Sequence, residues 1–597
     1  MTTMRIVSTC AAAALLLVST TVTAQTEKRA DVAGREFVSV TDAMLRDPDP
    51  ADWLMYSRTY DSHRFSPLRQ IDRSNVADLE LKWSKPLPEG VVEVVPLVYR
   101  GVMYAIAPPA ERGQQSAVLA LDATNGNLLW SHVPEGQGAS RIKSLAIYRD
   151  MIFYTAPAAV GELNPVMALD ARTGEVRWST PVTRETHTAG AIVAEGIVVS
   201  GRTCNSAREN CYIAAHDALT GKEVWRFYTA PDVGEPGDET WGGVPPSQRR
   251  TASWGLPGSY DPVRGLVYWG IANPMPNSRI DRHGGDANAI PATAPADLYS
   301  NSTVALDVKT GRLAWYYQHL PGDSWDMDIN NDKTLIRTVI DPDPRHVKWI
   351  NPDVPKGVER DVVVTVGEGG GLWVNDRDTG QFLWAMPFPY DTPDFILSDI
   401  DVKTGKTRIN MDVVFKKPGD RHTICFWNTR SYWPTAYHPR LNSLFVPYVD
   451  HCLDMTAGTP GGEADRRNSV RRPGSDPTKY AGLARIDMTT GEIHRFHEQQ
   501  AGGNGAMLAT AGDVVFWGDI MQTLYAFDAE TGEVLWQSEP LGAPVQTSTI
   551  TYAVDGKQYV AVINSNALIP PSRIADTGGV TMPARKGNSI NVFALPN

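Results

Sequence analysis

A short phrase recurs along the chain and constrains the fold more than any other feature. In its full form it reads Asp-x-x-Thr-Gly-x-x-x-Trp, as in "ALDVKTGRLAW". Copies end at Trp130, Trp178, Trp225, Trp315, Trp384 and Trp536, and "RIDMTTGEIHRF" is a degraded copy without the Trp. The leading residues Asp122, Asp170 and Asp217 are 48 and 47 residues apart. A period of 40–50 residues with strand-like patterning is typical of propeller blades.

The chemistry of the phrase supports this interpretation. Segments such as "VMALD" and "LYAFD" are short apolar strands. In the turn that follows, Asp can hydrogen-bond the backbone and Gly can take a positive φ. The Trp that ends the next strand suits the gap between neighbouring blades. We therefore predict an all-β fold, an eight-bladed β-propeller whose central channel is the natural ligand site.

Composition and charge narrow the function classes. The chain has 597 residues with 42% hydrophobic and 21% charged residues, which is ordinary for a globular protein. The formal net charge is −12 and the sequence contains no basic stripe, so nucleic acid is not an expected partner.

The first 24 residues have the features of a secretory signal. Arg5 supplies positive charge, "AAAALLLVST" is a short apolar run, and "VTA" ends at Ala24. The run is too short to span a membrane, and no later stretch could span one. We predict a signal peptide at residues 1–24, a periplasmic protein, and a single propeller domain over residues 25–597.

Four cysteines lie beyond that signal. An even number in an oxidising compartment favours disulfides, and the local pairings are Cys204–Cys211 and Cys425–Cys452. The sequence has no Cys-x-x-Cys-His motif, so we expect no covalently attached c-type haem in this chain.

An acidic cluster follows one of the repeats. Asp323, Asp326 and Asp328 lie in "PGDSWDMD", and Asn273 follows another strand in "YWGIANPMPN". Carboxylate and amide oxygens together suit a hard cation such as Ca²⁺. The alternative is that these are solvated loop residues.

With these motifs, the chain resembles the quinoprotein alcohol dehydrogenases, eight-bladed propellers that hold pyrroloquinoline quinone (PQQ) and a metal ion. The resemblance is carried by "RFSPLRQIDRSNVADLELKW", "WGIANPMP", "PGDSWDMD" and "LATAGDVVFWG", and it covers essentially the whole mature chain. It implies that Glu93 closes over the quinone, Thr188 hydrogen-bonds it, Trp254 stacks beneath it and Lys143 replaces a quinone-binding arginine. It further implies Asn273 and Asp326 as metal ligands, Asp326 also as the catalytic aspartate, and Asp328 as the extra carboxylate of lanthanide-dependent relatives. The expected ion is therefore Ca²⁺ or a lanthanide.

The sequence also departs from the family at several positions. No adjacent cysteines occur in "GASRIKSLA", where the family has a disulfide over the quinone. The family's glutamate metal ligand falls on Ser206, for which Glu209 could substitute, and a basic quinone contact falls on Glu368. The tryptophan that crowds the substrate falls on Asn504. We place Ser206 and Asn504 in the cofactor pocket and expect an open pocket that takes a bulky or secondary alcohol.

The resemblance implies a PQQ-dependent alcohol dehydrogenase. Asp326 would take the hydroxyl proton of the alcohol, and electrons would leave to a separate acceptor, a cytochrome c. The alternative is a non-enzymatic propeller that acts as a scaffold in outer-membrane assembly. The substitutions at Ser206 and Glu368 favour the scaffold, whereas Asn273, Trp254 and Asp326 together favour the enzyme.

Overall fold

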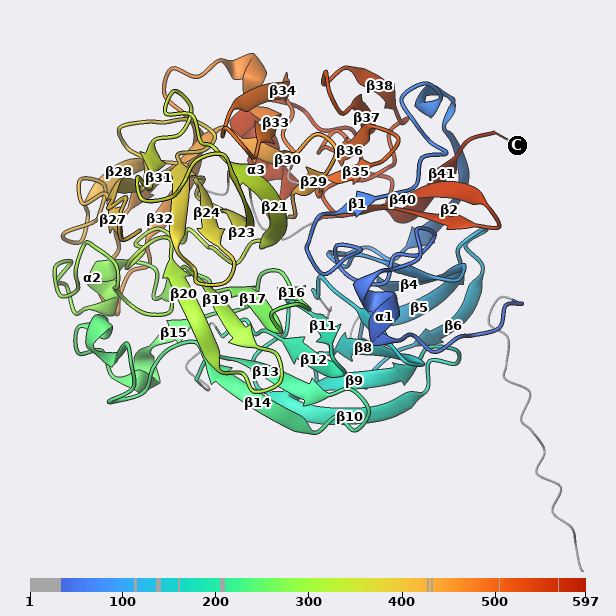
Figure 1. The fold of residues 1–597 in the computed structure, drawn as a ribbon, viewed down its shortest axis with the longest axis horizontal. Helices are drawn as coiled ribbons and strands as arrows, with labels where there is room; N and C mark the ends of the chain where they lie inside the picture. The colour runs from blue at the N-terminus through green and yellow to red at the C-terminus, as the bar shows by residue number, and fades with distance from the viewer. Residues whose placement is uncertain are drawn as a thin grey trace, which may run out of the picture.

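The computed structural model describes residues 34–111, 115–135, 141–158, 162–204, 210–426, 429–430, 433–503, 505–566 and 569–596. The predicted signal peptide lies outside the described residues. The protein is almost entirely built of β-strands, which succeed one another around a common centre in chain order (Figure 1). The predicted all-β propeller is confirmed.

Eight sheets of four or five strands form the ring in the described part of the chain. The first four are β3 (Leu97–Tyr99), β4 (Val102–Ala107), β5 (Ala117–Asp122), β6 (Leu128–His132); β7 (Ala146–Tyr148), β8 (Met151–Thr155), β9 (Asn164–Asp170), β10 (Val176–Thr183); β11 (Ala191–Ala194), β12 (Ile197–Ser200), β13 (Tyr212–Asp217), β14 (Glu223–Tyr228); and β16 (Ser259–Asp261), β17 (Leu266–Gly270), β19 (Ser302–Asp307), β20 (Leu313–Gln318). Strands β11 and β16 lie near the centre in Figure 1, whereas β6, β10 and β14 lie at the rim.

The other four sheets complete the circle. They are β21 (Thr334–Ile340), β23 (Val358–Val366), β24 (Leu372–Asp376), β25 (Phe382–Met386), β22 (Trp349–Ile350); β29 (Ala436–His438), β30 (Ser443–Val449), β33 (Ala481–Asp487), β34 (Ile493–Gln499); β1 (Phe65–Ser66), β35 (Leu508–Thr510), β36 (Val514–Gly518), β37 (Leu524–Asp528), β38 (Val534–Gln537); and β39 (Thr549–Val554), β40 (Lys557–Asn564), β41 (Asn588–Ala594), β2 (Glu80–Leu87).

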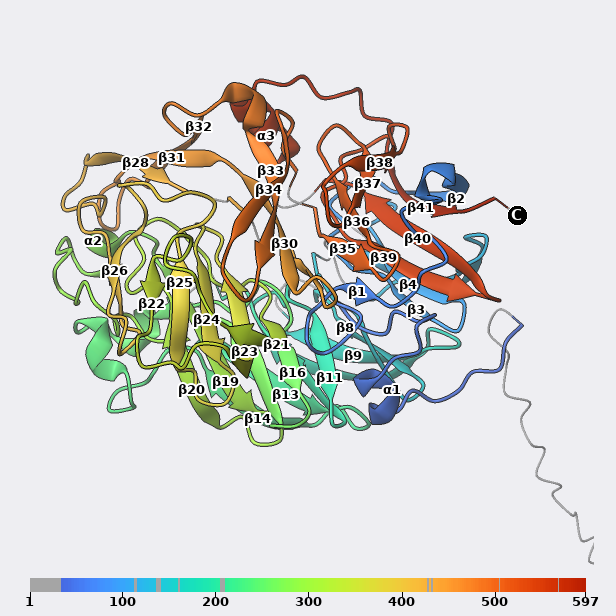
Figure 2. The same cartoon turned by 45° about the horizontal axis from the view of Figure 1, so that its top comes forward.

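Segments from the two ends of the chain share the last of these sheets. Strand β2 pairs antiparallel with β41, from Glu80 opposite Ala594 to Leu87 opposite Asn588. In Figure 2 the red strands β39–β41 lie side by side, with β2 beside β41. This pairing closes the ring.

At five places in the ring a Trp joins one sheet to the next one, as the sequence predicts for the repeated Trp. The indole of Trp130 donates to the Ala171 carbonyl oxygen at 3.1 Å, just after the Asp of the next repeat. Its ring lies against Gly174, where φ is +76° and an added Cβ would stand 2.5 Å from the indole. The same packing joins Trp83 to Gly126, Trp178 to Gly221, Trp225 to Gly311 and Trp315 to Gly380. We call these five contacts the Trp locks.

Smaller elements lie outside the ring. Three short sheets are β15 (Arg250–Thr251) with β18 (Pro274–Met275), β26 (Leu397–Ile400) with β27 (Thr407–Ile409), and β28 (Arg421–Cys425), β31 (His451–Thr456) and β32 (Arg466–Arg471). The helices are α1 (Asp42–Arg46), α2 (Arg279–Arg282) and α3 (Pro571–Gly578), with 3-10 turns η1 (Val76–Asp78), η2 (Asp238–Trp241), η3 (Pro246–Gln248) and η4 (Pro477–Lys479). None of the helices in the described part of the chain has the length and apolar run that crossing a bilayer would require.

Candidate active site

The predicted site residues lie in segments that lead into strands near the centre of the ring. These residues are Glu93 before β3, Lys143 before β7, Thr188 before β11, Trp254 before β16, and Asp326 and Asp328 before β21. The strands of the ring surround a common centre (Figure 1). The contacts below show which side chains come together there.

Lys143 and Glu93 form a buried ion pair. Lys143 Nζ lies 3.2 Å from Glu93 Oε2, and the two side chains are 1% and 0% exposed. Arg141 approaches the other Glu93 oxygen at 3.6 Å. Burial lowers the pKa of Lys143, and the Glu93 carboxylate opposes that effect. Lys143 Nζ also lies 4.8 Å from the centroid of the Trp254 ring, which sets a buried cation beside an aromatic face.

The backbone on both sides of Trp254 is tied down. Ser253 N donates to the Arg202 carbonyl oxygen at 2.8 Å, and Arg202 N donates to Ser253 Oγ at 2.9 Å. The Thr188 hydroxyl donates to the Trp254 carbonyl oxygen at 3.2 Å. Thr188 therefore holds the chain at Trp254. Thr188 is itself fixed next to Lys143, because Lys143 N donates to the Thr188 carbonyl oxygen at 3.1 Å.

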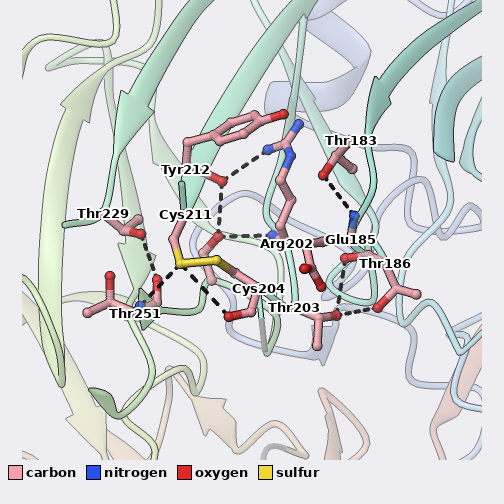
Figure 3. Close-up of a disulfide and its surroundings, with 11 residues drawn as sticks. Thr183, Glu185, Thr186, Arg202, Thr203, Cys204, Cys211, Tyr212, Thr229 and Thr251 are labelled. Carbon is pink, nitrogen blue, oxygen red and sulfur yellow. Dashed lines mark hydrogen bonds between the residues drawn. A yellow bond between two sulfur atoms is a disulfide. The ribbon is translucent and has the colours of Figure 1, made fainter. Parts of the chain in front are cut away.

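A disulfide braces the same region, as Figure 3 shows. Cys204 is bonded to Cys211, and Thr251 N donates to Cys211 Sγ at 3.3 Å. The buried Arg202 guanidinium lies 3.9 Å from the centroid of the Tyr212 ring and donates to the Tyr212 carbonyl oxygen at 3.0 Å. This predicted disulfide is confirmed, and so is Cys425–Cys452, which joins β28 to β31.

Asp328 is a buried carboxylate that faces both the aromatic ring and the predicted metal ligand. Its Oδ1 accepts from Asn273 N at 3.0 Å, and its Oδ2 accepts from Asn330 Nδ2 at 3.1 Å. The Trp254 indole is a further hydrogen-bond donor to this carboxylate. Burial, with a smaller contribution from the charge of Asp326, raises the pKa of Asp328 to about 8.

Asp326 differs from Asp328 in its exposure and in its partner. Its side chain is 35% exposed and its backbone has a positive φ of 74°. Oδ2 accepts from Arg467 Nη1 at 2.6 Å. The side-chain amides of Asn273 and Asn277 are 2.6 Å apart, and Arg467 also contacts the Asn277 amide. Asp326 and Asn273 are thus joined through two residues that the sequence did not single out.

The third acidic residue of the cluster shapes the loop instead of facing a ligand. Asp323 is fully buried, and its two carboxylate oxygens accept from Trp325 N and Met327 N, each at 2.7 Å. Asn301 Nδ2 donates to it at 3.2 Å. These bonds fix the turn that presents Asp326 and Asp328.

Glu368 lies next to this cluster. Its N–H donates to the Asp328 carbonyl oxygen at 3.1 Å, and only 7% of the residue is exposed. Burial and the charges of Asp328 and Asp326 raise the pKa of Glu368 well above its usual range. The nearby Arg430 is fully buried and is bound to Asp332 and to the Val366 carbonyl oxygen. Glu368, which the sequence predicts in place of a basic quinone contact, therefore adds another acid to the cluster.

The predicted ligands offer the chemistry that a hard cation needs, namely carboxylate and amide oxygens close together. Within the described ranges, however, no three or more His, Cys, Asp or Glu side chains form a ready-made metal-binding group. Ser206, Glu209 and Asn504 lie outside the described residues.

Comparisons with known proteins place this geometry in a family. The model of the glucose/ethanol/alcohol dehydrogenase β-propeller domain matches residues 179–389 and 480–560, and a model of the outer membrane protein assembly factor BamB matches residues 71–227. Quinohemoprotein alcohol dehydrogenase ADH-IIG of Pseudomonas putida is 30% identical over 567 residues, which span 86% of this chain and 72% of the relative. The chain belongs to the PQQ-dependent alcohol dehydrogenases.

Solved structures of this quinoprotein family have the same fold. The structure of ADHIIG from Pseudomonas putida HK5 superimposes with a TM-score of 0.75 at 27% identity, covering 93% of this chain and 82% of that one. A europium-containing methanol dehydrogenase superimposes with a TM-score of 0.77 at 25% identity, covering 93% of this chain and all of that one. The predicted membership of the quinoprotein oxidoreductases is confirmed.

Arg467 and Asn277 are the residues that sequence reasoning missed. Arg467 lies 141 positions after Asp326, in a polar segment without a motif. Asn277 lies four residues after Asn273, at the end of the phrase "YWGIANPMPN" in which only Asn273 was singled out. A lone arginine or asparagine in a loop carries no signal of its own, and only the folded chain brings the two together.

Proposed function

We propose that the protein is a periplasmic, PQQ- and metal-dependent dehydrogenase that oxidises an alcohol to an aldehyde or ketone. It passes the electrons to an external acceptor, a cytochrome c. The observation that carries the proposal is the partly exposed Asp326 carboxylate beside Asn273 and Asp328, with the Trp254 ring and the buried Lys143 next to them.

The quinone side of the site fits a planar anionic cofactor. Trp254 is partly buried and offers a flat apolar face, while Lys143 and Arg141 offer cationic donors to carboxylate and quinone oxygens. When bound, PQQ supplies the two-electron acceptor and the metal ion supplies a Lewis acid. Glu93 keeps the Lys143 ammonium in place, and Thr188 keeps the Trp254 segment in place.

The metal side fits a hard cation. Asn273, Asp326 and Asp328 would hold the ion through an amide oxygen and two carboxylates. We propose Ca²⁺ or a lanthanide. A trivalent ion gains more from the additional carboxylate of Asp328, and the structural neighbour that contains europium supports this option.

Asp326 accepts the hydroxyl proton of the alcohol. Arg467 fixes Oδ2, and within the described residues no hydrogen bond occupies Oδ1. The carboxylate therefore has one oxygen anchored, and the other is available both to the metal ion and to the substrate hydroxyl. Because the side chain is 35% exposed, the proton has a short route to water.

The finer features of the proposal rest on the sequence. Asn504 stands where the family has a bulky tryptophan, and the family's adjacent cysteines are missing from the sequence. Both features favour an open pocket that takes a bulky or secondary alcohol. The two disulfides support an oxidising compartment such as the periplasm. The pairing of β2 with β41 supports a single propeller domain over residues 25–597 after removal of a signal at 1–24.

Reconstitution tests this function directly. The purified protein is stripped with a chelator, incubated with PQQ and either Ca²⁺ or La³⁺, and passed through a desalting column. We expect PQQ to stay with the protein only in the presence of a cation, and dye-linked alcohol oxidation to appear in the same samples. If no cation makes the protein retain PQQ, the dehydrogenase proposal is wrong. The alternative is then a non-enzymatic scaffold, since the BamB model matches residues 71–227.

A further inference from the structure

The proposed cation ligands come from two segments that are far apart in the chain. Asn273 belongs to the segment that follows β17, and Asp326 and Asp328 belong to the loop that precedes β21. Asn273 N donates to Asp328 Oδ1 at 3.0 Å, but that carboxylate is itself a proposed ligand of the ion. A fixed spacing between the two segments therefore requires bonds from residues that do not bind the ion.

Arg282, at the end of α2, donates hydrogen bonds to both segments at once. Its side chain is 1% exposed. Nη1 donates to the carbonyl oxygens of Pro276 and Asn277 at 2.7 and 2.5 Å, in the segment that begins with Asn273. Nη2 donates to the Asp323 carbonyl oxygen at 2.7 Å, in the aspartate loop. Because a guanidinium is planar and rigid, these bonds set the distance between the two segments.

Asp297 holds the guanidinium of Arg282 in one orientation. Its Oδ2 accepts from Arg282 Nη2 at 2.9 Å and from Nε at 3.2 Å. The other oxygen lies 3.2 Å from His283 Nε2, and the Asp297 side chain is fully buried. A buried ion pair adds little net stability, because both charges lose their hydration. What this pair supplies is a fixed direction for the donors that reach the two segments.

Asn301 makes a second connection between the same segments. Its N–H donates to the Ala272 carbonyl oxygen at 2.9 Å, directly before Asn273. Its Nδ2 donates to the Met327 carbonyl oxygen at 2.9 Å and to Asp323 Oδ2 at 3.2 Å, in the aspartate loop. Asn301 is fully buried and has a positive φ of 48°, a conformation that asparagine adopts more readily than most residues. This connection does not depend on the bonds of Arg282.

We propose that Arg282 and Asn301 are positioning residues that set the spacing between Asn273 and the two aspartates, and thereby the affinity of the site for its cation. The inference rests on the proposed dehydrogenase function and adds residues that act on the ion only through its ligands. Within the described residues, neither side chain donates a hydrogen bond to a side-chain oxygen of these three ligands. Both act by holding the backbone that carries the ligands.

The variant Arg282→Lys tests the first connection. Lysine keeps the charge beside Asp297 but lacks the planar fork that reaches both segments. The metal-free protein with PQQ is titrated with Ca²⁺ and with La³⁺, and the change in PQQ absorbance gives the midpoint cation concentration. We expect this midpoint to rise by about 10–100-fold. At saturating cation, kcat for alcohol oxidation should also fall by at least about tenfold, with the KM for the alcohol nearly unchanged.

Arg279→Lys is the matched control. Arg279 is fully buried on the same helix, but its side chain donates to the Pro291 carbonyl oxygen at 2.6 Å and to Met411 Sδ at 3.3 Å, not to the two ligand segments. We expect this control to lower the midpoint of thermal unfolding, as Arg282→Lys does, but to leave the cation midpoint and kcat unchanged.

A second variant tests the other connection. Asn301→Gly keeps the positive φ and the backbone bond to Ala272 and removes both side-chain bonds. Its cation midpoint should rise and its kcat should fall, as in Arg282→Lys. Unchanged values in both folded variants, or an equal change in Arg279→Lys, overturn this inference alone. If the unmodified protein retains no PQQ with either cation, the proposed function is overturned instead.

Discussion

Polar and bulky groups have different surroundings at the blade junctions and at the axial site, by which we mean the candidate active site around Asp326, Asp328 and Glu368. At each Trp lock the indole N–H has a carbonyl partner in the next sheet, and glycine leaves room for the ring, as with Trp130 and Gly174. At the axial site the two acids Asp328 and Glu368 are buried near one another, and burial raises the pKa of both. The junctions need no added partner, whereas the proposed cation would offset the buried acids of the axial site. The difference separates residues that stabilise the ring from residues that serve a ligand.

The largest expected effect comes from the axial site. Asp326→Asn removes the proton acceptor but keeps the shape of the side chain, so dye-linked turnover should fall by about 10²–10⁴-fold. Because Asp326 is partly exposed, the midpoint of thermal unfolding should stay close to that of the unmodified protein. Asp286→Asn is the matched control for loss of one loop carboxylate. Turnover in Asp326→Asn near the original rate would remove this residue from the chemistry.

The junctions should show the reverse behaviour. Gly174→Ala places a Cβ 2.5 Å from the Trp130 indole, and we expect it to destabilise the protein by about 1–3 kcal/mol through overpacking, beyond the cost of its positive φ. Gly234→Ala is the control, because Gly234 also has a positive φ of 78° but nothing lies within 4 Å of an added Cβ.

Denaturant titration of both glycine variants measures this difference. Equal losses of unfolding free energy in Gly174→Ala and Gly234→Ala would show that the close approach of the ring does not matter. In that case the proposed role of the Trp locks in stability would have to be given up.

A third experiment uses the protonation of Asp328. In the metal-free protein its pKa is raised to about 8, whereas an unfolded aspartate has a value near 3.9. Between these values the folded state holds a proton that the unfolded state lacks. The contribution of Asp328 to stability is therefore present at low pH and is lost as the pH rises toward about 8, with a slope of up to about 1.4 kcal/mol per pH unit.

The readout is the unfolding free energy of the metal-free protein minus that of Asp328→Asn, measured from pH 5 to pH 9. We expect the difference to fall with pH and to become flat above about pH 8. The affinity for an added cation should increase as the pH rises through this range, because the cation has to displace that proton. A difference that is independent of pH would contradict the buried, protonated state of Asp328.

The smallest effect concerns the turn of the repeat. Thr310 Oγ1 donates to Asp307 Oδ1 at 2.9 Å on the exposed side of a blade. Thr310→Val keeps the shape of the side chain and removes this bond, so we expect a loss of about 0.5–1.5 kcal/mol with no change in turnover. An altered kcat would show that the rim and the axial site are coupled, contrary to the separation described above.

Much of the fold could be predicted because the repeat is local. Asp, Gly and Trp at fixed spacing specify a strand, a turn and a junction within one period, as Gly380 and Trp315 illustrate. The site was accessible mainly through family resemblance, which pointed to Trp254 and Asp326. The partners of these residues could not be predicted, because Arg467 lies 141 positions after Asp326 and meets it only in the folded chain. The same applies to the environment of Glu368, whose burial depends on segments from several sheets.

The pairing of β2 with β41 has a consequence for the order in which the molecule can mature. Strand β2 ends at Leu87, so nearly the entire polypeptide must be synthesised before its neighbour exists. The segment that carries Glu93 is fastened by the same closing sheet, because Ser565 exchanges hydrogen bonds with Val92 at 3.3 and 3.0 Å. Until the C-terminal strands arrive, the ring stays unsealed and the lysine–glutamate pair beside the aromatic ring lacks this support. Enclosure of a cofactor is thereby tied to completion of the chain.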